Sequence, residues 1–317
     1  MRRVFITGVS GYIGMKLAEE LVRRDKVDEI VGIDVNRPPR DIPKLIFYER
    51  DVRHPVDDIL GKHGIDTIIH AAFILSPTHD KRNMEDININ GTRNILASAA
   101  AAGVHHILYT SSATAYGFYG DNPVPLTEED GLRGNDSITY SKTKRIIEEI
   151  FRDFLARNPH ITATILRPSF VVGPGFDNPL ARHLRKKLVF LPRKTTPLQF
   201  VHEDDLMEII IMMLEKGKGG IFNVGARGAM SVYDMARRLG NIPVPLPAPL
   251  LYPFNALAWA LRLSMLTEFP SSMLLLIRHP WIVSSEKLEK ATGYTFQYDT
   301  IRAFDIYAAH ICQRVMR

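Results

Sequence analysis

Short apolar runs recur along the first half of the chain, separated by stretches in which apolar residues are spaced as on one face of a helix. The runs occupy residues 2–6, 29–34, 45–52, 67–72 and 107–112. The fourth run is continuously apolar, as expected of a strand that is covered on both faces in the middle of a parallel sheet. Helical spacing follows the first and the last run. The pattern therefore predicts an α/β protein with a parallel sheet.

A glycine-rich turn joins the first predicted strand to the first predicted helix. It reads Thr7-Gly8-Val9-Ser10-Gly11-Tyr12-Ile13-Gly14. Gly8 permits a tight turn, Gly11 lets backbone amides approach a pyrophosphate, and Gly14 lets the helix pack against the sheet. The amides around Tyr12 and Ile13, together with the helix dipole, favour negative charge. An ordinary strand-to-helix turn is the alternative, so a dinucleotide site needs support from the rest of the chain.

Asp34 ends the second predicted strand, 20 residues after the last glycine of the turn. A carboxylate at this place accepts hydrogen bonds from an adenosine ribose and repels a 2′-phosphate, which favours NAD over NADP. Arg37 and Arg40 come soon after it and offset part of that repulsion. The alternative is that Asp34 only caps a turn. At the end of the fourth strand, the small residues Ala71 and Ala72 leave room for a cofactor where ligands bind in such sheets.

Tyr140 and Lys144 are four residues apart in a predicted helix and therefore share one face. An ammonium and an oxidised nicotinamide near the phenol favour phenolate, so we expect the pKa of Tyr140 to move from near 10 toward neutrality. Tyr140 then exchanges a proton with a substrate hydroxyl while the nicotinamide exchanges a hydride, and Ser112 holds the same oxygen. Without these neighbours, the Tyr-Lys pair would be a solvated helix face.

The glycine spacing and the Tyr-x-x-x-Lys pair resemble the extended short-chain dehydrogenase/reductase family, in particular its NAD-dependent epimerase/dehydratase branch. Further motifs that resemble this family are Asn88–Asn94, Leu166-Arg167-Pro168, Phe200–Leu206 and Phe222–Gly225. The stretch Ser111–Gly117 is similar to the version found in UDP-hexose 4-epimerases. Ala113 and Thr114 stand where 4,6-dehydratases carry an Asp-Glu pair, which argues against dehydration chemistry.

The resemblance also implies cofactor contacts outside the glycine turn. Asp51 and Val52 correspond to residues that meet the adenine ring, and Asn88 to an asparagine that contacts the cofactor. Pro168 and Ser169 are expected to contact it as well. Asn88 is alternatively a cap of the helix that begins near it.

Candidate substrate contacts depart from the nucleotide-sugar pattern at two positions. Phe170 replaces an asparagine that binds the substrate diphosphate, and Leu198 replaces an arginine. Each lost charge-assisted contact forfeits on the order of 2–3 kcal/mol, so a UDP-sugar would need compensating groups. Arg193, Lys194 and Arg278 are candidates for that role. The predicted substrate contacts are Phe73, Thr114, Phe170, Asn178, Arg193 and Arg278.

We predict a doubly wound parallel sheet that binds NAD, built mainly from residues 1–168. A smaller α+β substrate domain is expected from residues 169–317, with segments that cross back to the sheet. The helices that start near Asn88 and Tyr140 resemble those that form a dimer bundle in the family. A homodimer is therefore expected.

Composition narrows the class of protein. The chain has 317 residues, of which 45% are hydrophobic and 24% charged, as in ordinary globular proteins. Cys312 is the only cysteine, which excludes an internal disulfide and a cysteine-based metal site, and no metal site is expected. The net charge of +5 suits phosphorylated ligands but is no nucleic-acid signature. No signal peptide or transmembrane segment is evident, so a cytoplasmic location is the default expectation.

An apolar segment at residues 245–283 leaves three interpretations open. It could pack as ordinary core, form a pocket for a lipid-, steroid- or isoprenoid-like alcohol, or contact a membrane surface. The first functional hypothesis is therefore an NAD-dependent epimerase or oxidoreductase acting on a secondary alcohol of a sugar or sugar nucleotide. The second is a 3β-hydroxysteroid-dehydrogenase-like enzyme for an apolar alcohol. The third is a dinucleotide-sensing protein without turnover, against which Tyr140 and Lys144 weigh.

Overall fold

The computed structural model describes residues 3–315, and its centre is a seven-stranded sheet with the order β10-β6-β5-β4-β1-β2-β3. Every neighbouring pair in it is parallel. The strands are β1 (Arg3–Thr7), β2 (Glu29–Asp34), β3 (Leu45–Glu49), β4 (Thr67–His70), β5 (His106–Thr110), β6 (Thr162–Pro168) and β10 (Gly220–Val224). The strand order reverses between β1 and β4, which is where such sheets bind ligands. The predicted fold class, a doubly wound parallel sheet, is confirmed.

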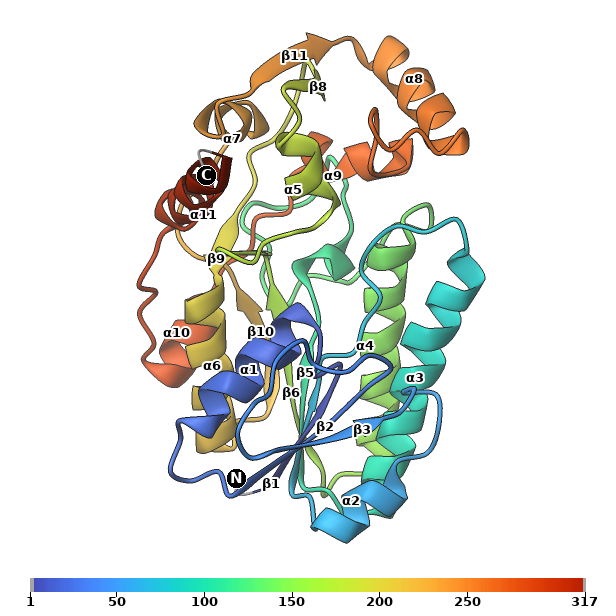
Figure 1. The fold of residues 1–317 in the computed structure, drawn as a ribbon, viewed down its shortest axis with the longest axis vertical. Coiled ribbons are helices and arrows are strands. Elements are labelled where there is room, and N and C mark those ends of the chain that lie inside the picture. Colours follow the sequence, from blue (N-terminus) through green and yellow to red (C-terminus); the bar gives the residue numbers. More distant parts are fainter. Residues whose placement is uncertain (1–2, 316–317) are drawn as a thin grey trace.

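Two helical layers cover the sheet, as Figure 1 shows. One face packs against α1 (Tyr12–Val22), α6 (Glu203–Lys216) and α10 (Glu286–Thr292), and the other against α2 (Asp57–His63), α3 (Lys81–Ala101) and α4 (Thr139–Arg157). Successive side chains of a strand point to opposite faces, so Val4 and Ile6 join the first core while Phe5 joins the second. The continuous apolar runs are therefore covered on both sides.

Among the boundaries that differ from the sequence prediction, two change the place of predicted cofactor residues. Helix α3 begins at Lys81 because the Asp80 side chain accepts a hydrogen bond from the Asn83 amide at 3.1 Å. Asn88 therefore lies inside the helix, and the alternative that it caps the helix is wrong. Strand β3 ends at Glu49, so Asp51 belongs to the loop after it.

The later chain forms a second region above the carboxyl ends of the strands (Figure 1). Its own core is large and rich in aromatic side chains. Its elements are α5 (Pro179–Leu184), α7 (Val232–Arg238), α8 (Ala248–Ala260), α9 (Leu275–Arg278), α11 (Thr300–Val315), and the strand pairs β7 (Phe170–Val172) with β9 (Phe200–His202) and β8 (Leu188–Pro192) with β11 (Ile242–Leu246). Two single-turn 3₁₀ helices, η1 (Ala113–Tyr116) and η2 (Ser271–Leu274), complete the chain. Because α6 and β10 return to the sheet, the division at residue 168 stays a prediction.

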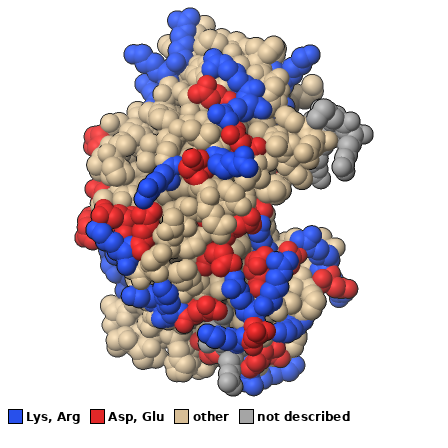
Figure 2. Space-filling model, turned by 90° about the vertical axis from the view of Figure 1, so that its left-hand side faces the viewer, with Lys and Arg blue, Asp and Glu red and all other residues tan. Residues whose placement is uncertain are grey.

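Surface charge is mixed. On the face drawn in Figure 2, Lys and Arg atoms are interspersed with Asp and Glu atoms over much of the surface. Within residues 3–315, no helix has the length and apolar character needed to cross a membrane.

Candidate active site

A cavity of ≈ 490 Å³ lies at the carboxyl ends of β1, β4, β5 and β6, between the sheet and the second region. One end of its wall is the glycine turn, the middle is formed by the residues after β5 and by the start of α4, and the other end is apolar. The predicted site residues that line it are Gly8, Gly11, Tyr12, Ile13, Gly14, Ala71, Phe73, Ser112, Thr114, Tyr140, Lys144, Pro168, Ser169, Phe170 and Asn178. Residues from distant stretches of the sequence thus meet in one place.

The glycine turn has the geometry that its spacing predicts. Gly8 has φ +70°, and a Cβ there would lie 2.7 Å from the Cα of Ala72. A Cβ on Gly14 would lie 2.2 Å from the carbonyl oxygen of Gly8, so only glycine lets α1 start this close to β1. Gly11 is the residue before α1 and its backbone is extended. The turn therefore leaves backbone amides open at a helix start, as a pyrophosphate requires.

Three predicted cofactor residues surround the site without lining the cavity. Asp34 accepts hydrogen bonds from the amides of Ser10 (3.2 Å) and Asn36 (3.1 Å), so it joins the end of β2 to the glycine turn. Asp51 is bound by Arg53 at 2.6 Å, and this guanidinium lowers the pKa of Asp51. Asn88 exchanges hydrogen bonds with the backbone of Ile74 and thereby fixes the loop after β4.

Two further predicted contacts, Val52 and Ala72, pack against glycines instead. Val52 is buried, and its Cγ2 is 2.5 Å from where a Cβ on Gly91 would stand. Ala72 is the close neighbour of Gly8, and its amide donates to the Thr7 hydroxyl at 3.1 Å.

The three predicted reacting groups meet on the cavity wall. Ser112 follows β5 and caps η1, its hydroxyl accepting from the Thr114 amide at 3.2 Å. Tyr140 lies in the first turn of α4, and its ring packs edge-on against Phe73 with centroids 5.3 Å apart. Lys144, one turn later, donates to the Thr110 carbonyl at 2.7 Å and to the Tyr109 hydroxyl at 3.1 Å.

Burial shifts the pKa of Tyr140 and the pKa of Lys144. It raises the pKa of Tyr140, although hydrogen bonding to the Ser112 and Thr114 side chains opposes the rise. It also lowers the pKa of Lys144 from 10.5 to about 7, against the attraction of Glu148. The expected move of the Tyr140 pKa toward neutrality includes the charge of an oxidised nicotinamide and stays a prediction; from the protein alone, desolvation moves this pKa the other way. A phenol in this setting is a proton donor.

A buried polar network lies beneath the reacting groups and was missed from the sequence. Glu148 accepts from Ser111 at 2.6 Å and from Arg167 at 2.7 Å, and Arg167 also donates to the Tyr116 hydroxyl at 2.7 Å. Glu148 is one helical turn after Lys144 on the same face of α4. The only sequence signal was that spacing, together with an Arg in the predicted β6.

The substrate end of the cavity is apolar. Phe170 lies within an aromatic group in which Phe176, Phe200 and Trp281 are its neighbours, at centroid distances of 5.1 to 6.5 Å. Leu198, the second position that departs from the nucleotide-sugar pattern, is buried. The wall is completed by residues that the sequence prediction did not assign: Leu180, His183, Leu191, Leu206, Phe269, Met273, Leu274, Leu276 and Ile277.

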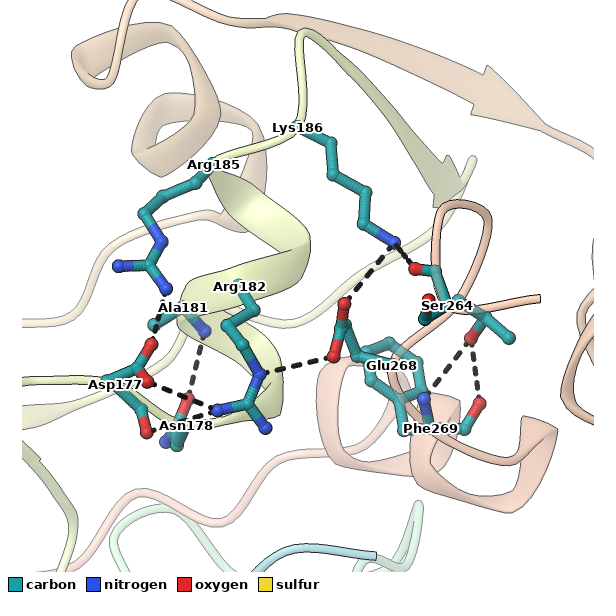
Figure 3. Close-up of polar contacts among 10 residues, drawn as sticks. Asp177, Asn178, Ala181, Arg182, Arg185, Lys186, Ser264, Glu268 and Phe269 are labelled. Carbon is teal, nitrogen blue, oxygen red and sulfur yellow. Dashed lines mark hydrogen bonds and ion pairs between the residues drawn. The ribbon is translucent and has the colours of Figure 1, made fainter. Parts of the chain in front are cut away.

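The two arginines predicted to contact the substrate do not reach the cavity. Arg193 and Arg278 are exposed and lie outside the cavity wall. Among the described residues, the wall includes no arginine, and its one lysine is Lys144 at the reacting end. Asn178 does line the cavity, and its side chain caps α5 by accepting from the Ala181 amide at 2.9 Å (Figure 3). No cluster of His, Cys, Asp or Glu within the described part of the chain could hold a metal ion.

The structure thus combines a glycine turn at the switch point of a parallel sheet with Ser, Tyr and Lys side chains on the wall of one cavity. The sequence model of the NAD dependent epimerase/dehydratase family matches residues 4–225. The chain belongs to this family, and it is an enzyme of a class whose cofactor is NAD. The predictions of family, enzyme class and cofactor are confirmed at that level.

Known relatives agree over different lengths. An uncharacterised protein of Mycobacterium tuberculosis is 27% identical over 313 residues, which cover 96% of this chain and 82% of that protein. A UDP-glucose 4-epimerase of Erwinia amylovora is 29% identical over 195 residues, 57% of this chain and 54% of the epimerase. The crystal structure of UDP-glucose 4-epimerase from Thermotoga maritima with UDP-glucose aligns with a TM-score of 0.77 at 17% identity, covering 99% of this chain and all (100%) of that one. The structural likeness shows the shared fold.

Proposed function

We propose that this protein transfers a hydride between NAD and a secondary alcohol, with Ser112, Tyr140 and Lys144 as the reacting and positioning side chains. The observation that carries the proposal is that all three side chains line the same cavity as the glycine turn. A cofactor seated on that turn and a substrate at the apolar end would then meet beside Tyr140. Epimerisation and net oxidation or reduction both begin with this step.

The residues fit NAD. Gly8 and Gly14 leave space that a Cβ would fill, which lets the backbone of the turn approach a pyrophosphate. Asp34, at the end of β2, offers a carboxylate for the adenosine ribose and disfavours a 2′-phosphate. Asp51 and Val52 are proposed to border the adenine ring. Bound NAD supplies the acceptor and donor of the hydride.

Each reacting side chain has a separate role. Tyr140 holds the mobile proton: its phenol gives the proton to a ketone oxygen in reduction, and its phenolate receives one from an alcohol in oxidation. Ser112 donates a hydrogen bond to the same oxygen and holds it in line. Lys144, fixed by the Thr110 carbonyl and the Tyr109 hydroxyl, brings positive charge to the site when it is protonated.

The cavity wall supports an alcohol with an apolar body, such as a steroid-, isoprenoid- or lipid-like alcohol. Phe170, Phe269 and Ile277 are representative of the surface that this body would cover. Burying such a body against apolar side chains stabilises the complex by roughly 25 cal/mol per Å² of apolar surface. A diphosphate at the same place would lack the guanidinium partners that charge-assisted binding requires.

A sugar nucleotide is the second candidate. It is supported by the 29% identity to a UDP-glucose 4-epimerase and by Asn178 at the start of α5. The two candidates differ in the polarity of the substrate, so panels of hydroxysteroids, isoprenoid alcohols and sugar nucleotides separate them. Reduced nicotinamide absorbance reports oxidation, and product stereochemistry reports epimerisation.

Tyr140→Phe tests the chemistry with whichever substrate is accepted. We expect kcat to fall by about 10²- to 10⁴-fold because the proton donor is lost while the ring remains. Tyr119→Phe is the matched control, since Tyr119 lies outside the cavity wall and should leave kcat unchanged. Full turnover by Tyr140→Phe would show that the phenol is not the acid.

A homodimer formed through α3 and α4 and a cytoplasmic location remain proposals. The two helices pack against each other along the same face of the sheet, which supports a four-helix dimer interface. Light scattering of the purified chain measures the mass of the particle directly.

A further inference from the structure

Helix α8 exposes a stripe of large apolar side chains to solvent, whereas a helix of a protein core buries them. Leu250, Phe254, Leu257 and Leu261 are spaced by four, three and four residues, so they share one stripe, and between 42% and 64% of each is exposed. The opposite side of the helix faces the protein and includes Asn255, which is buried and donates to the Phe269 carbonyl at 2.9 Å. The buried side of the helix, with Asn255, therefore fixes its orientation so that the apolar stripe faces solvent.

The turn after α8 extends the same surface. Leu263, Met265 and Leu266 are exposed, Met265 by 88%. We call the exposed apolar side chains of Leu250–Leu266 the α8 surface. An exposed apolar area of this kind marks an interaction site when it is rimmed by polar groups of one character.

Here the rim is cationic. Residues 177–200 and 241–268 contain seven Lys and Arg residues and two acids, Asp177 and Glu268, which pair with Arg182, Arg185 and Lys186. Arg193 donates its amide to Leu246, just before α8, and Arg262 follows the end of the helix. No ion pair within the described residues engages Lys187, Arg193, Lys194 or Arg262. At the upper end of the molecule, where β8 and β11 lie in Figure 1, Figure 2 shows projecting Lys and Arg side chains with a few Asp and Glu atoms among them; α8 lies on the far side of that view.

The α8 surface is fastened to the wall of the active-site cavity. Arg182 of α5 donates to Glu268 at 3.1 Å, and Lys186 donates to the Ser264 carbonyl at 2.9 Å, as Figure 3 shows. A cleft of ≈ 530 Å³ runs between α5, the end of α8 and residues 77–80. Its wall continues that of the cavity along the chain, because Ser76 and Phe269 line the cavity while Pro77 and Glu268 line the cleft.

We propose that the α8 surface docks this protein on an anionic phospholipid membrane. Apolar side chains of a surface helix enter the boundary between headgroups and acyl chains, and flanking cations attract anionic lipids. A second copy of the chain is a poorer occupant, because a twofold contact would bring together Lys187, Arg193, Lys194 and Arg262, while the nearby acids Asp177 and Glu268 are already paired with Arg182, Arg185 and Lys186. The membrane contact does not depend on the proposed function of the cavity.

Flotation with lipid vesicles tests the docking. Wild-type protein is expected to float with phosphatidylcholine vesicles that contain phosphatidylserine, and much less with phosphatidylcholine alone. The double variant Leu257→Glu, Leu261→Glu should lower binding by about tenfold or more, since a single apolar side chain that leaves water accounts for roughly that factor. Ile301→Glu is the matched control: Ile301 is 42% exposed but lies on α11, so its binding should equal that of wild type.

A charge variant separates lipid attraction from apolar adhesion. Arg193→Glu, Arg262→Glu should weaken binding to the anionic vesicles by about fivefold or more for each residue, without effect on phosphatidylcholine alone. Far-ultraviolet circular dichroism and thermal unfolding verify that each variant is folded. Absence of wild-type flotation would overturn the proposal. So would a wild-type dimer that Leu257→Glu, Leu261→Glu converts to a monomer, because a second copy would then cover the surface.

Discussion

Helices α6 and α8 have nearly the same length, 14 and 13 residues, but opposite relations to water. In α6 the apolar side chains are buried, among them Leu206, Ile210 and Leu214, and three acids occupy the first turn. In α8 the leucines of the outer stripe are exposed, and a polar Asn255 is buried. Two helices that are both rich in apolar residues can thus differ in whether those residues are buried. In α8 the polar Asn255 shows the difference, because it faces the protein while the leucines of the stripe face solvent.

Leucine truncation should give the largest separation between the two helices. Leu214→Ala in α6 is expected to lower the free energy of unfolding by about 2–5 kcal/mol, because a buried leucine leaves a cavity in the core beside the sheet. Leu257→Ala at the matching end of α8 should change it by less than about 0.5 kcal/mol. Urea denaturation of both variants measures the pair. Equal losses would mean that α8 is covered in solution.

Helix α4 adds a buried charge to this contrast. Lys144 is 3% exposed, and burial lowers its pKa from 10.5 to about 7. The unfolded chain then binds a proton that the folded chain has released between about pH 7 and pH 10.5, so this group makes the folded state more stable as pH rises. Removal of this charge gains about 4 kcal/mol at pH 7, and loss of the hydrogen bonds to Thr110 and Tyr109 costs about 1 kcal/mol each. Lys144→Met should therefore raise the free energy of unfolding at pH 7 by on the order of 2 kcal/mol, and the gain should shrink toward pH 10.

The control for that variant lies half a turn away on the same helix. Lys142 is half-buried and pairs with Glu85 at 2.9 Å. Lys142→Met should change the free energy of unfolding by less than about 1 kcal/mol at either pH. A Lys144→Met gain that did not depend on pH would show that packing, not charge, causes it. Whatever the cause of the gain in stability, we expect Lys144→Met to lose turnover.

Removing the buried amide of α8 should have the smallest effect of the three. Asn255→Ala removes one of the two donors to the Phe269 carbonyl, which keeps the Thr267 hydroxyl at 2.8 Å, and the loss is expected to cost about 1 kcal/mol. Thermal unfolding gives the shift. Because Asn255 orients the helix, the variant should also weaken vesicle flotation, and flotation at the wild-type level would show that the orientation of α8 does not depend on this bond.

Much of the sheet and the cofactor end could be predicted from the sequence. The glycine turn carries its own geometry, since Gly8 and Gly14 are required wherever backbone must come this close, and strands covered on both faces have continuous apolar runs. The Tyr-x-x-x-Lys spacing places both side chains on one helical face in any context. These features depend on residues close together in the sequence, so they can be predicted without knowing the rest of the fold.

The substrate end and its electrostatics could not be predicted in the same way. Phe269, Met273 and Ile277 reach the cavity only because the tertiary fold brings η2, α9 and the turn before them to the end of the cavity opposite the glycine turn. In the sequence, residues 245–283 form one apolar segment, whereas the structure divides it into the exposed α8 surface and a cavity wall. The direction of the pKa shift of Tyr140 also required the tertiary structure, because desolvation depends on everything that surrounds the phenol.

The loop after β4 touches both the chemistry and the outer surface. At one end, the centroid of the Phe73 ring lies 3.9 Å from the Lys144 ammonium nitrogen, and near the other, His79 stacks on Trp259 of α8 with centroids 4.5 Å apart. One short stretch of backbone therefore joins α8 to the amine that is proposed to act in catalysis. If α8 docks on a membrane as proposed, we therefore expect turnover with anionic vesicles to differ from turnover in free solution.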